Sequence, residues 1–394
     1  MTSPTSRAIS RLGIGTYRLA LGVPEHERVL YKALERQEDP RLNLNLIDTS
    51  SNYSNGRSEQ LIGKVLSNPR KNTLRRNEVA IATKFGYIMN ENMRLLSEGA
   101  FQRVPPEEIV TYSRECYHCI HPEFMRDQLT RSLERLNTKY VDIFFVHNPE
   151  YFLMTNMSAE MNVKKQQNIL LGRMSVLFEA LEREIERGRI RSYGISSNSF
   201  ALKPAHAHFL PYQALVKMAT QAFDRVREQR EIEIKLFQEN LTKHDRIAQA
   251  MEASSTSSSP STPKPAVGGG YQTTKSISRS SHGLKFLQMP GNLLEMEGVL
   301  TTAKWAKSHD LNVFVNRPLN AISPVLGAVR LASYPAPQSP TYSQGKARVL
   351  ETLSNVERQY ENLQPKMRSL KRMIKDMDAS LKNDKLSIMQ EEST

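Results

Sequence analysis

Short apolar runs that end in polar residues alternate with helical segments along the first 204 residues of the chain, and this alternation constrains the fold more than any other feature. Five runs have the length of strands, at residues 12–16, 44–49, 79–84, 141–147 and 190–196. Helical segments lie between them at residues 26–36, 57–66, 123–136 and 177–187. The runs are almost continuously apolar, as expected for strands that helices cover on both faces. The pattern therefore predicts an α/β protein with a parallel sheet wrapped by helices.

The composition narrows the class of protein further. With 39% hydrophobic and 24% charged residues, the chain can bury a large core, which excludes wholesale disorder and a collagen-like repeat. No apolar run approaches the roughly 18 residues that a membrane span needs, so we expect no membrane-spanning helix. The two cysteines are too few for a disulfide framework and indicate a reducing compartment.

The chain is basic, with 54 Lys and Arg residues against 41 Asp and Glu residues. The excess gathers in acid-free stretches at residues 7–18 and 264–285, which contain few aromatic residues. Specific nucleic-acid recognition would need a basic helix with a docking motif or an aromatic stacking array. We therefore expect no specific nucleic-acid partner and interpret these stretches as solvated segments.

The first residues bear on localisation. They lack acids and contain Arg and Ser, which resembles a weak transit peptide and leaves a mitochondrial location as the alternative. The first expected strand already begins at residue 12, so cleavage would damage the fold. We expect a cytoplasmic location.

Four chemically active residues stand at or near the ends of consecutive strands. Asp48, Lys84 and His147 end the second, third and fourth strands, and Tyr53 follows Asp48 by five residues. Each residue alone has an ordinary structural explanation, such as an ion pair or a hydrogen-bonded His. Because the carboxyl ends of parallel strands lie at one edge of the sheet, we expect the four side chains to converge above it.

The motifs around these residues resemble the aldo-keto reductase family. The resemblance rests on LIDTS at 46–50 with Tyr53, SEQLIG at 58–63, TK at 83–84, LERL at 133–136 with YVD at 140–142, VHN at 146–148, and GRIR at 188–191 with GIS at 194–196. Six motifs in the family's order make it specific. Within the family, residues 147–150 and 316–320 most resemble the sugar and aldose dehydrogenases.

This resemblance implies a (β/α)8 TIM barrel that binds NADPH or NADH and a small carbonyl or sugar substrate. The implied activity interconverts an aldehyde, ketone or aldose and its alcohol or lactone by hydride transfer. Tyr53 would donate the proton, and Lys84 would lower the pKa of Tyr53 toward the working range. Asp48 would hold Lys84 in place, and His147 would donate a hydrogen bond to the carbonyl oxygen.

The same resemblance implies five cofactor contacts. Ser197, Asn198 and Gln288 correspond to the polar residues that hold the nicotinamide carboxamide, although an additional Ser leaves the alignment open by one position. Asn316 falls where the family stacks an aromatic ring on the nicotinamide, so that stacking is lost or supplied elsewhere. Arg317 belongs to a weaker late match at residues 317–319.

The end of the chain departs from the family. Residues 284–289 and 311–316 add two strands, which makes seven, and the eighth strand and the basic motif for a 2′-phosphate have no counterpart. We therefore expect a barrel whose eighth strand is missing or replaced. An alternative function follows from this departure, namely a catalytically weak cofactor-sensing or regulatory scaffold on the same fold.

Four regions organise the chain. We expect the first part of the barrel at residues 1–223, a helical and then disordered insertion at 224–283, the last recognisable barrel part at 284–330, and a linker with a helix at 331–394. Nine apolar residues between Leu353 and Leu381 keep a three-four spacing, a coiled-coil-like stripe that Pro365 interrupts. We expect this helix to pack within the chain, and self-association or a partner helix is the alternative.

Two further segments lie between the motifs. Cys116, His118, Cys119 and His121 are spaced too closely to surround one zinc ion without a distant second pair, so we predict no metal site. We expect them to form a loop near the mouth of the site, in which a thiol is redox-sensitive. Residues 148–172 are expected to form a long loop over the site.

Overall fold

The structure is a computed structural model that describes residues 9–36, 43–68, 74–155, 162–254, 279–323, 327–331 and 342–359, together with residues 364, 365, 368, 369, 371, 372 and 374. It divides into two compact units. The first comprises residues 1–289 and 297–314, and the second comprises residues 290–296 and 315–394. The fourfold division with boundaries at residues 223, 283 and 330 stays a prediction.

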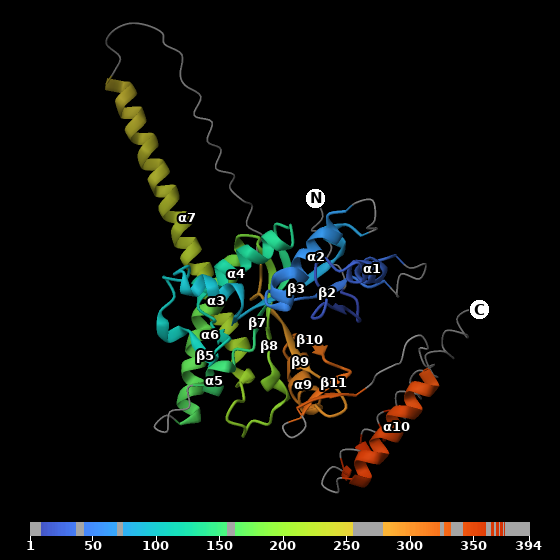
Figure 1. Ribbon diagram of the computed structural model, residues 1–394. Helices are drawn as coiled ribbons and strands as arrows, with labels where there is room; N and C mark the ends of the chain where they lie inside the picture. Colours follow the sequence, from blue (N-terminus) through green and yellow to red (C-terminus); the bar gives the residue numbers. More distant parts are fainter. Residues whose placement is uncertain are drawn as a thin grey trace, which may run out of the picture. The chain divides into compact units, whose positions relative to one another are not determined.

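A seven-stranded sheet forms the centre of the first unit (Figure 1), and only residues 290, 315 and 316 at the ends of its last two strands are assigned to the second unit. Its strands, in spatial order, are β1 (Ile14–Gly15), β2 (Leu46–Asp48), β3 (Ala80–Phe85), β7 (Val141–His147), β8 (Ile190–Ser196), β9 (Leu284–Pro290) and β10 (Asn312–Asn316). The pairs from β1 to β9 are parallel. The strands correspond to the seven predicted from the sequence, in the order of a (β/α)8 barrel, and the prediction of fold class is confirmed. Within the described residues the sheet has no eighth strand.

Side chains alternate between the two faces of these strands. Phe144 and Val146 of β7 belong to the large core cluster between the sheet and the helices, whereas Ile143 and Phe145 belong to a separate cluster. This second cluster is completed by Leu46, Ala82 and Phe286 from the neighbouring strands. Because successive strand residues point to opposite faces, the second cluster marks the interior of the barrel.

Helices connect the strands and cover the outer face. They are α1 (Pro24–Ala33), α2 (Arg57–Leu66), α3 (Glu91–Ser97), α4 (Pro122–Arg135), α5 (Tyr151–Thr155), α6 (Val163–Glu186), α7 (Leu215–Ser254), α8 (Glu297–Leu300) and α9 (Thr302–Ser308). Short 3-10 helices lie at Tyr53–Gly56 (η2), Arg76–Glu78 (η3), Pro106–Glu108 (η4), Asn198–Ala201 (η5) and Tyr212–Ala214 (η6). Helix α4 illustrates the local reasons: Pro122 begins it, the His121 side chain accepts a hydrogen bond from the Glu123 amide, and Met125, Leu129 and Ser132 are buried on one face.

The expected long loop at residues 148–172 is wrong in part, because α5 and the first turns of α6 occupy it. The Asn162 side chain begins α6 by accepting a hydrogen bond from the Lys165 amide. Gln166, Leu170 and Met174 are buried along this part of the helix. A buried Gln and an internal glycine at position 172 weakened the helical pattern in the sequence.

The segment that contains the cysteines forms a small antiparallel sheet, β4 (Tyr87–Ile88), β6 (Cys116–His118) and β5 (Val110–Ser113), in that order. Residues 119–121 form the expected loop before α4, whereas Cys116 and His118 lie in a strand. The expectation of a redox-sensitive thiol is wrong. Cys116 and Cys119 are 8% and 1% exposed. Burial raises the pKa of both thiols, that of Cys119 to about 12, so neither forms a reactive thiolate at neutral pH. The described residues contain no group of three His, Cys, Asp or Glu side chains that could hold a metal ion.

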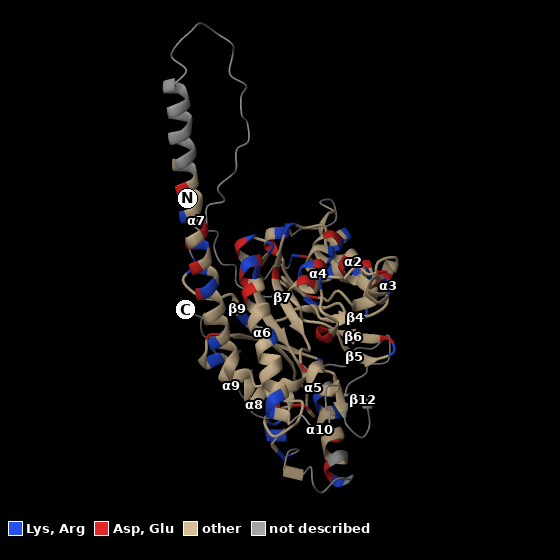
Figure 2. Ribbon diagram, turned by 90° about the vertical axis from the view of Figure 1, so that its left-hand side faces the viewer, with Lys and Arg blue, Asp and Glu red and all other residues tan. Residues whose placement is uncertain are grey.

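Helix α7 packs on α6 through its first turns. Ala219, Ala222 and Val226 are buried there, and Arg225 pairs with Glu179 at 2.6 Å. In the following turns apolar side chains are exposed, and Lys, Arg, Asp and Glu residues alternate along the helix (Figure 2). None of the helices in the described ranges combines the length and the apolar character that crossing a membrane requires.

The second unit contains an antiparallel pair, β11 (Asn320–Ser323) and β12 (Gly327–Arg330), and helix α10 (Tyr342–Gln359). In α10, Leu353 is 3% exposed and packs with Val349, Leu293, Met296 and Ile374. The described part of the heptad stripe therefore packs within this chain. Most of its remaining positions lie outside the described residues, so a coiled coil stays a prediction.

Candidate active site

The site lies at the carboxyl ends of five neighbouring strands. Its side chains are Asp48 of β2, Lys84 of β3, His147 of β7, Ser196 of β8 and Gln288 of β9. Each stands two residues after a position that faces the barrel interior, namely Leu46, Ala82, Phe145, Gly194 and Phe286. Because side chains repeat their direction every second residue, all five point into the mouth of the barrel.

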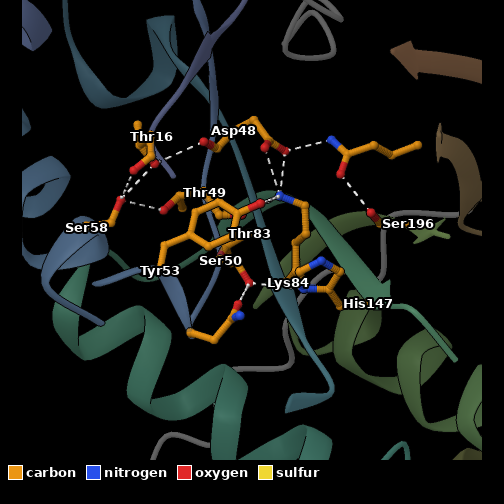
Figure 3. A network of polar contacts seen from close by, with 12 residues as sticks. Thr16, Asp48, Thr49, Ser50, Tyr53, Ser58, Thr83, Lys84, His147 and Ser196 are labelled. Atoms are coloured by element: carbon orange, nitrogen blue, oxygen red, sulfur yellow. Dashed lines mark hydrogen bonds and ion pairs between the residues drawn. The ribbon is translucent and has the colours of Figure 1, made fainter. Parts of the chain in front are cut away.

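Lys84 is the centre of this arrangement (Figure 3). Its side chain is fully buried, and its Nζ donates to both oxygens of Asp48 at 2.8 Å and to the Thr49 carbonyl oxygen at 2.7 Å. The same Nζ lies 3.3 Å from the Tyr53 hydroxyl oxygen. Burial alone lowers the pKa of Lys84, but Asp48 and Tyr53 raise it above its ordinary value. The amine is therefore charged at neutral pH.

Tyr53 is held by a turn of unusual backbone conformation. Ser54, Asn55 and Gly56 have φ of 49°, 55° and 78°, in the left-handed region. A Cβ atom at Gly56 would lie 2.8 Å from the Arg135 side chain, so both the conformation and the space favour glycine. The turn directs the Tyr53 hydroxyl toward Lys84 immediately before α2 begins.

The expected direction of the Tyr53 pKa is wrong. Burial raises the pKa of Tyr53 above its ordinary value of 10, and this effect outweighs the lowering by the Lys84 charge. The sequence indicated the neighbouring amine but not how deeply the phenol is buried. Tyr53 is therefore a protonated phenol at neutral pH, which is the form that can donate a proton.

The His147 ring lies near that of Tyr53, with ring centroids 6.4 Å apart. Burial lowers its pKa well below 6.5, and the charge of Lys84 and the nearby His118 act in the same direction. The ring is therefore neutral at pH 7. The Tyr87 ring packs edge-on against it at 4.8 Å, and His118 Nε2 donates to the His147 carbonyl oxygen at 2.6 Å.

Gln288 connects two of the strand ends. Its Nε2 donates to Asp48 Oδ1 at 2.8 Å, and its Oε1 accepts from the Ser196 hydroxyl at 2.7 Å. Ser196 was not among the predicted site residues. The signal for it was the alternation itself, because Ser196 stands two residues after Gly194, whose small size admits Phe145 and the Phe286 carbonyl.

Ser197 and Asn198 are bonded to a residue that the sequence did not indicate, Glu150. The Ser197 hydroxyl donates to Glu150 Oε2 at 2.8 Å, and the backbone N–H of Asn198 donates to Oε1 at 2.9 Å. Glu150 is 1% exposed, and burial raises its pKa to about 7 despite these bonds. Nothing in the sequence indicated that the Glu150 carboxylate, three residues after His147, would bond to the two residues that follow β8. Whether Ser197 and Asn198 contact a cofactor stays a prediction.

Asn316 and Arg317 belong to the second unit. Arg317 has φ of 55° and pairs with Glu295 at 2.9 Å, and its carbonyl oxygen accepts from Asn292 Nδ2 at 3.3 Å. Their predicted cofactor contacts stay predictions.

A buried ion pair braces the site from behind. Glu59 of α2 is fully buried and accepts from Thr83 Oγ1 at 2.5 Å and from Arg135 Nε at 2.7 Å. The bonds tie α2 and α4 to the strand that carries Lys84. They give the motifs at 58–63 and 133–136 a structural reason.

Comparisons with known proteins place the chain in a family. The family model described as the Aldo/keto reductase family matches residues 11–239, more than half of the chain. The NADH-specific methylglyoxal reductase of Escherichia coli (strain K12) is 30% identical over 150 residues, which cover 36% of this chain and 39% of that protein. The D-arabinose 1-dehydrogenase of Saccharomyces cerevisiae is 36% identical over 108 residues, 27% of this chain and 24% of that protein.

A structural neighbour is the holo form of aldo-keto reductase AKR11C1 from Bacillus halodurans, with a TM-score of 0.43 and 16% identity over 87% of this chain and 72% of that chain. The aldo-keto reductase YhdN of Bacillus subtilis is 25% identical over 52% of this chain and 50% of that protein. The chain thus spans half or less of the length of these curated relatives, since it covers 39% of the Escherichia coli protein. The extent of the family match decides the classification: the chain belongs to the aldo/keto reductase family.

Proposed function

We propose that the chain is an NAD(P)H-dependent reductase that interconverts a small aldehyde, ketone or aldose and its alcohol or lactone. The observation that carries the proposal is the contact of one buried ammonium, Lys84, with both oxygens of Asp48 at 2.8 Å and with the Tyr53 hydroxyl at 3.3 Å. A buried cation beside a phenol supports proton transfer, because it stabilises the anion that the phenol leaves behind.

The residues at the strand ends fit a nicotinamide carboxamide. This group needs one hydrogen-bond donor and one acceptor, and the Ser196 hydroxyl and the Gln288 amide provide both at one edge of the Lys84 network. Ser196 and Gln288 would hold the carboxamide, and the Glu150 carboxylate would position the adjacent Ser197 and Asn198. When bound, the reduced cofactor supplies the hydride.

Tyr53 donates its hydroxyl proton to the carbonyl oxygen that is being reduced. The phenolate that remains is stabilised by Lys84, which Asp48 keeps charged and oriented. Asp48 is thus a positioning residue rather than a base. His147 is neutral and offers a ring nitrogen to the substrate oxygen, where a hydrogen bond would stabilise the developing negative charge.

The substrate class follows from the relatives, whose names include methylglyoxal reductase, D-xylose reductase and D-arabinose 1-dehydrogenase. All three compounds are small polar carbonyls. The Tyr and His side chains at the mouth offer hydrogen bonds to such molecules.

The test is direct. The purified chain is titrated with NADPH and with NADH by cofactor fluorescence, and turnover is measured with methylglyoxal, D-xylose and D-arabinose. We expect binding and turnover in the wild type, loss of turnover with retained cofactor affinity in Tyr53→Phe, and no change in Tyr140→Phe. Tyr140 precedes β7 at the opposite end of the strand, so it is the matched control. Failure to bind either cofactor would refute the proposal, and binding without turnover would favour the regulatory alternative.

A further inference from the structure

Ser50 forms a hydrogen bond with the His147 ring. Its Oγ lies 3.3 Å from His147 Nδ1, as the dashed line between the two side chains shows (Figure 3). Among the described residues, it is the one hydrogen-bond partner that the ring has. The same Oγ donates to Asn52 Oδ1 at 2.6 Å. Ser50 therefore stands between an amide and the imidazole.

Counting protons assigns the tautomer of His147. A hydroxyl group has one proton to donate, and the Ser50 proton points to Asn52 Oδ1. A neutral imidazole carries one proton on one of its two ring nitrogens. With the Asn52 amide in this orientation Ser50 has no second proton, so His147 Nδ1 is the donor to Ser50 Oγ and Nε2 is an acceptor.

Titratable groups on several strands and on η2 surround the neutral His147 ring. The charge of Lys84 on β3 lowers the pKa of His147, and Lys84 is itself paired with Asp48 of β2. The other titratable groups that face the ring are Tyr53 of η2 and Tyr87 of β4, and His118 of β6 bonds to the His147 carbonyl. Burial lowers the pKa of His118 to about 4, so this group is neutral as well.

We propose that Ser50 is a positioning residue that transmits the orientation of the Asn52 amide to the His147 ring and so decides which ring nitrogen carries the proton. With the amide oxygen toward Ser50, as in this structure, Nε2 of His147 accepts hydrogen bonds. When the Asn52 amide makes a half-turn, its Nδ2 donates to Ser50 Oγ and Ser50 donates to Nδ1. His147 then gives up its Nδ1 proton to water and takes a proton from water at Nε2, so the ring stays neutral.

The second state is the one that suits carbonyl reduction, because a carbonyl oxygen accepts hydrogen bonds and only a protonated Nε2 can donate one. The first state suits an alcohol, whose hydroxyl can donate to Nε2. This consequence rests on the proposed function, whereas the link between Ser50 and the tautomer does not.

The tautomer is measured by nitrogen NMR on protein labelled at histidine, with the His147 signals identified by their loss in His147→Asn. We expect the Nδ1-protonated form in the wild type and in Ser50→Thr, which keeps the hydroxyl. In Ser50→Ala the constraint is lost, and the population should move toward the Nε2-protonated form that predominates for histidine in water. An unchanged tautomer in Ser50→Ala would overturn the proposal.

A double-mutant cycle tests the transmission. A carboxylate can only accept, so Asn52→Asp holds the Ser50 proton and keeps His147 protonated at Nδ1. We expect it to lower kcat/KM for carbonyl reduction by about 100-fold, the effect of removing one oxyanion donor. In the Ser50→Ala background the same substitution should change kcat/KM by less than about threefold, because the relay is absent.

Asn55→Asp is the matched control, since it adds the same charge to the same loop and, among the described residues, the Asn55 side chain has no hydrogen bond with Ser50. An equal effect of Asn52→Asp with and without the Ser50 hydroxyl would show that the charge acts directly and would overturn the proposal. If the wild type shows no turnover, the proposed function fails, while the NMR arm still decides the role of Ser50.

Discussion

Glu150 makes the stability of this protein depend on pH, and Glu150→Gln tests this dependence. Its carboxyl group is buried and accepts hydrogen bonds from the Ser197 hydroxyl and the Asn198 amide. A glutamine at this position has the same shape, and its oxygen can still accept from the Asn198 amide. Its nitrogen can donate to Ser197 Oγ, so the variant keeps the packing and removes the titration.

The sign follows from the raised pKa. Burial moves the pKa of Glu150 from 4.5 to about 7, so the folded state holds this proton more tightly than the unfolded state. The contribution of Glu150 to the free energy of unfolding is therefore largest below pH 4.5 and is lost as the pH rises through about 7. A pKa difference of one corresponds to about 1.4 kcal/mol, so between pH 5 and pH 8 the wild type should lose about 2 to 3 kcal/mol through this group.

The assay is urea unfolding of the wild type and Glu150→Gln at pH 5 and pH 8, with the difference between the two proteins compared across pH. We expect the variant to gain about 2 to 3 kcal/mol relative to the wild type between the two pH values. Glu115→Gln, at an exposed position in the turn between β5 and β6, should show the same difference at both. A difference for Glu150→Gln that does not change with pH would refute the reasoning.

Three further predictions concern the site and the sheet. Lys84→Met removes the cation beside Tyr53 and should lower kcat/KM for carbonyl reduction by about 100-fold or more in steady-state assays, with cofactor affinity retained. Because burial raises the pKa of Tyr53 above 10, carbonyl reduction should vary by less than about twofold between pH 7 and 9, and a loss of rate with an apparent pKa near 8 would contradict this. Gly194→Ala brings a Cβ to 2.4 Å from the Phe286 carbonyl oxygen and should lower the free energy of unfolding by about 1 to 3 kcal/mol in the same urea experiment. Gly172→Ala is the control, because nothing lies within 4 Å of its Cβ, and it should raise the free energy of unfolding by up to about 1 kcal/mol.

The strands could be predicted from the sequence because each is a largely apolar run of five to seven residues with its own polar ending, and that signal is local. The convergence of Asp48, Lys84 and His147 was equally accessible, since it needs only the parallel arrangement and a period of two. The start of α6 was not, because Gln166 is buried without being apolar. Its burial depends on what lies opposite, and that information is not in the segment.

The electrostatic state of the site could not be predicted for the same reason. Whether the phenol of Tyr53 has a pKa above or below 10 depends on the balance between burial and the Lys84 charge, and the sequence shows only that both groups exist. Likewise, the Glu150 carboxylate meets Ser197 across 47 positions of the chain. No spacing rule links a residue that follows one strand to a residue at the end of the next strand, when helices lie between them.

The burial of Glu59 gives a structural reason for two of the motifs that this chain shares with the family. By composition, the glutamate of SEQLIG and the arginine of LERL belong on the solvent faces of α2 and α4, where most such residues lie. In the fold, Glu59 is fully buried and bonded to Arg135 and Thr83. Removing Arg135 would leave the fully buried Glu59 carboxylate without its cation, and an uncompensated buried charge typically costs about 3 to 5 kcal/mol. Replacing Glu59 or Arg135 alone therefore breaks the pair, so we expect each residue to tolerate substitution poorly while the other is present.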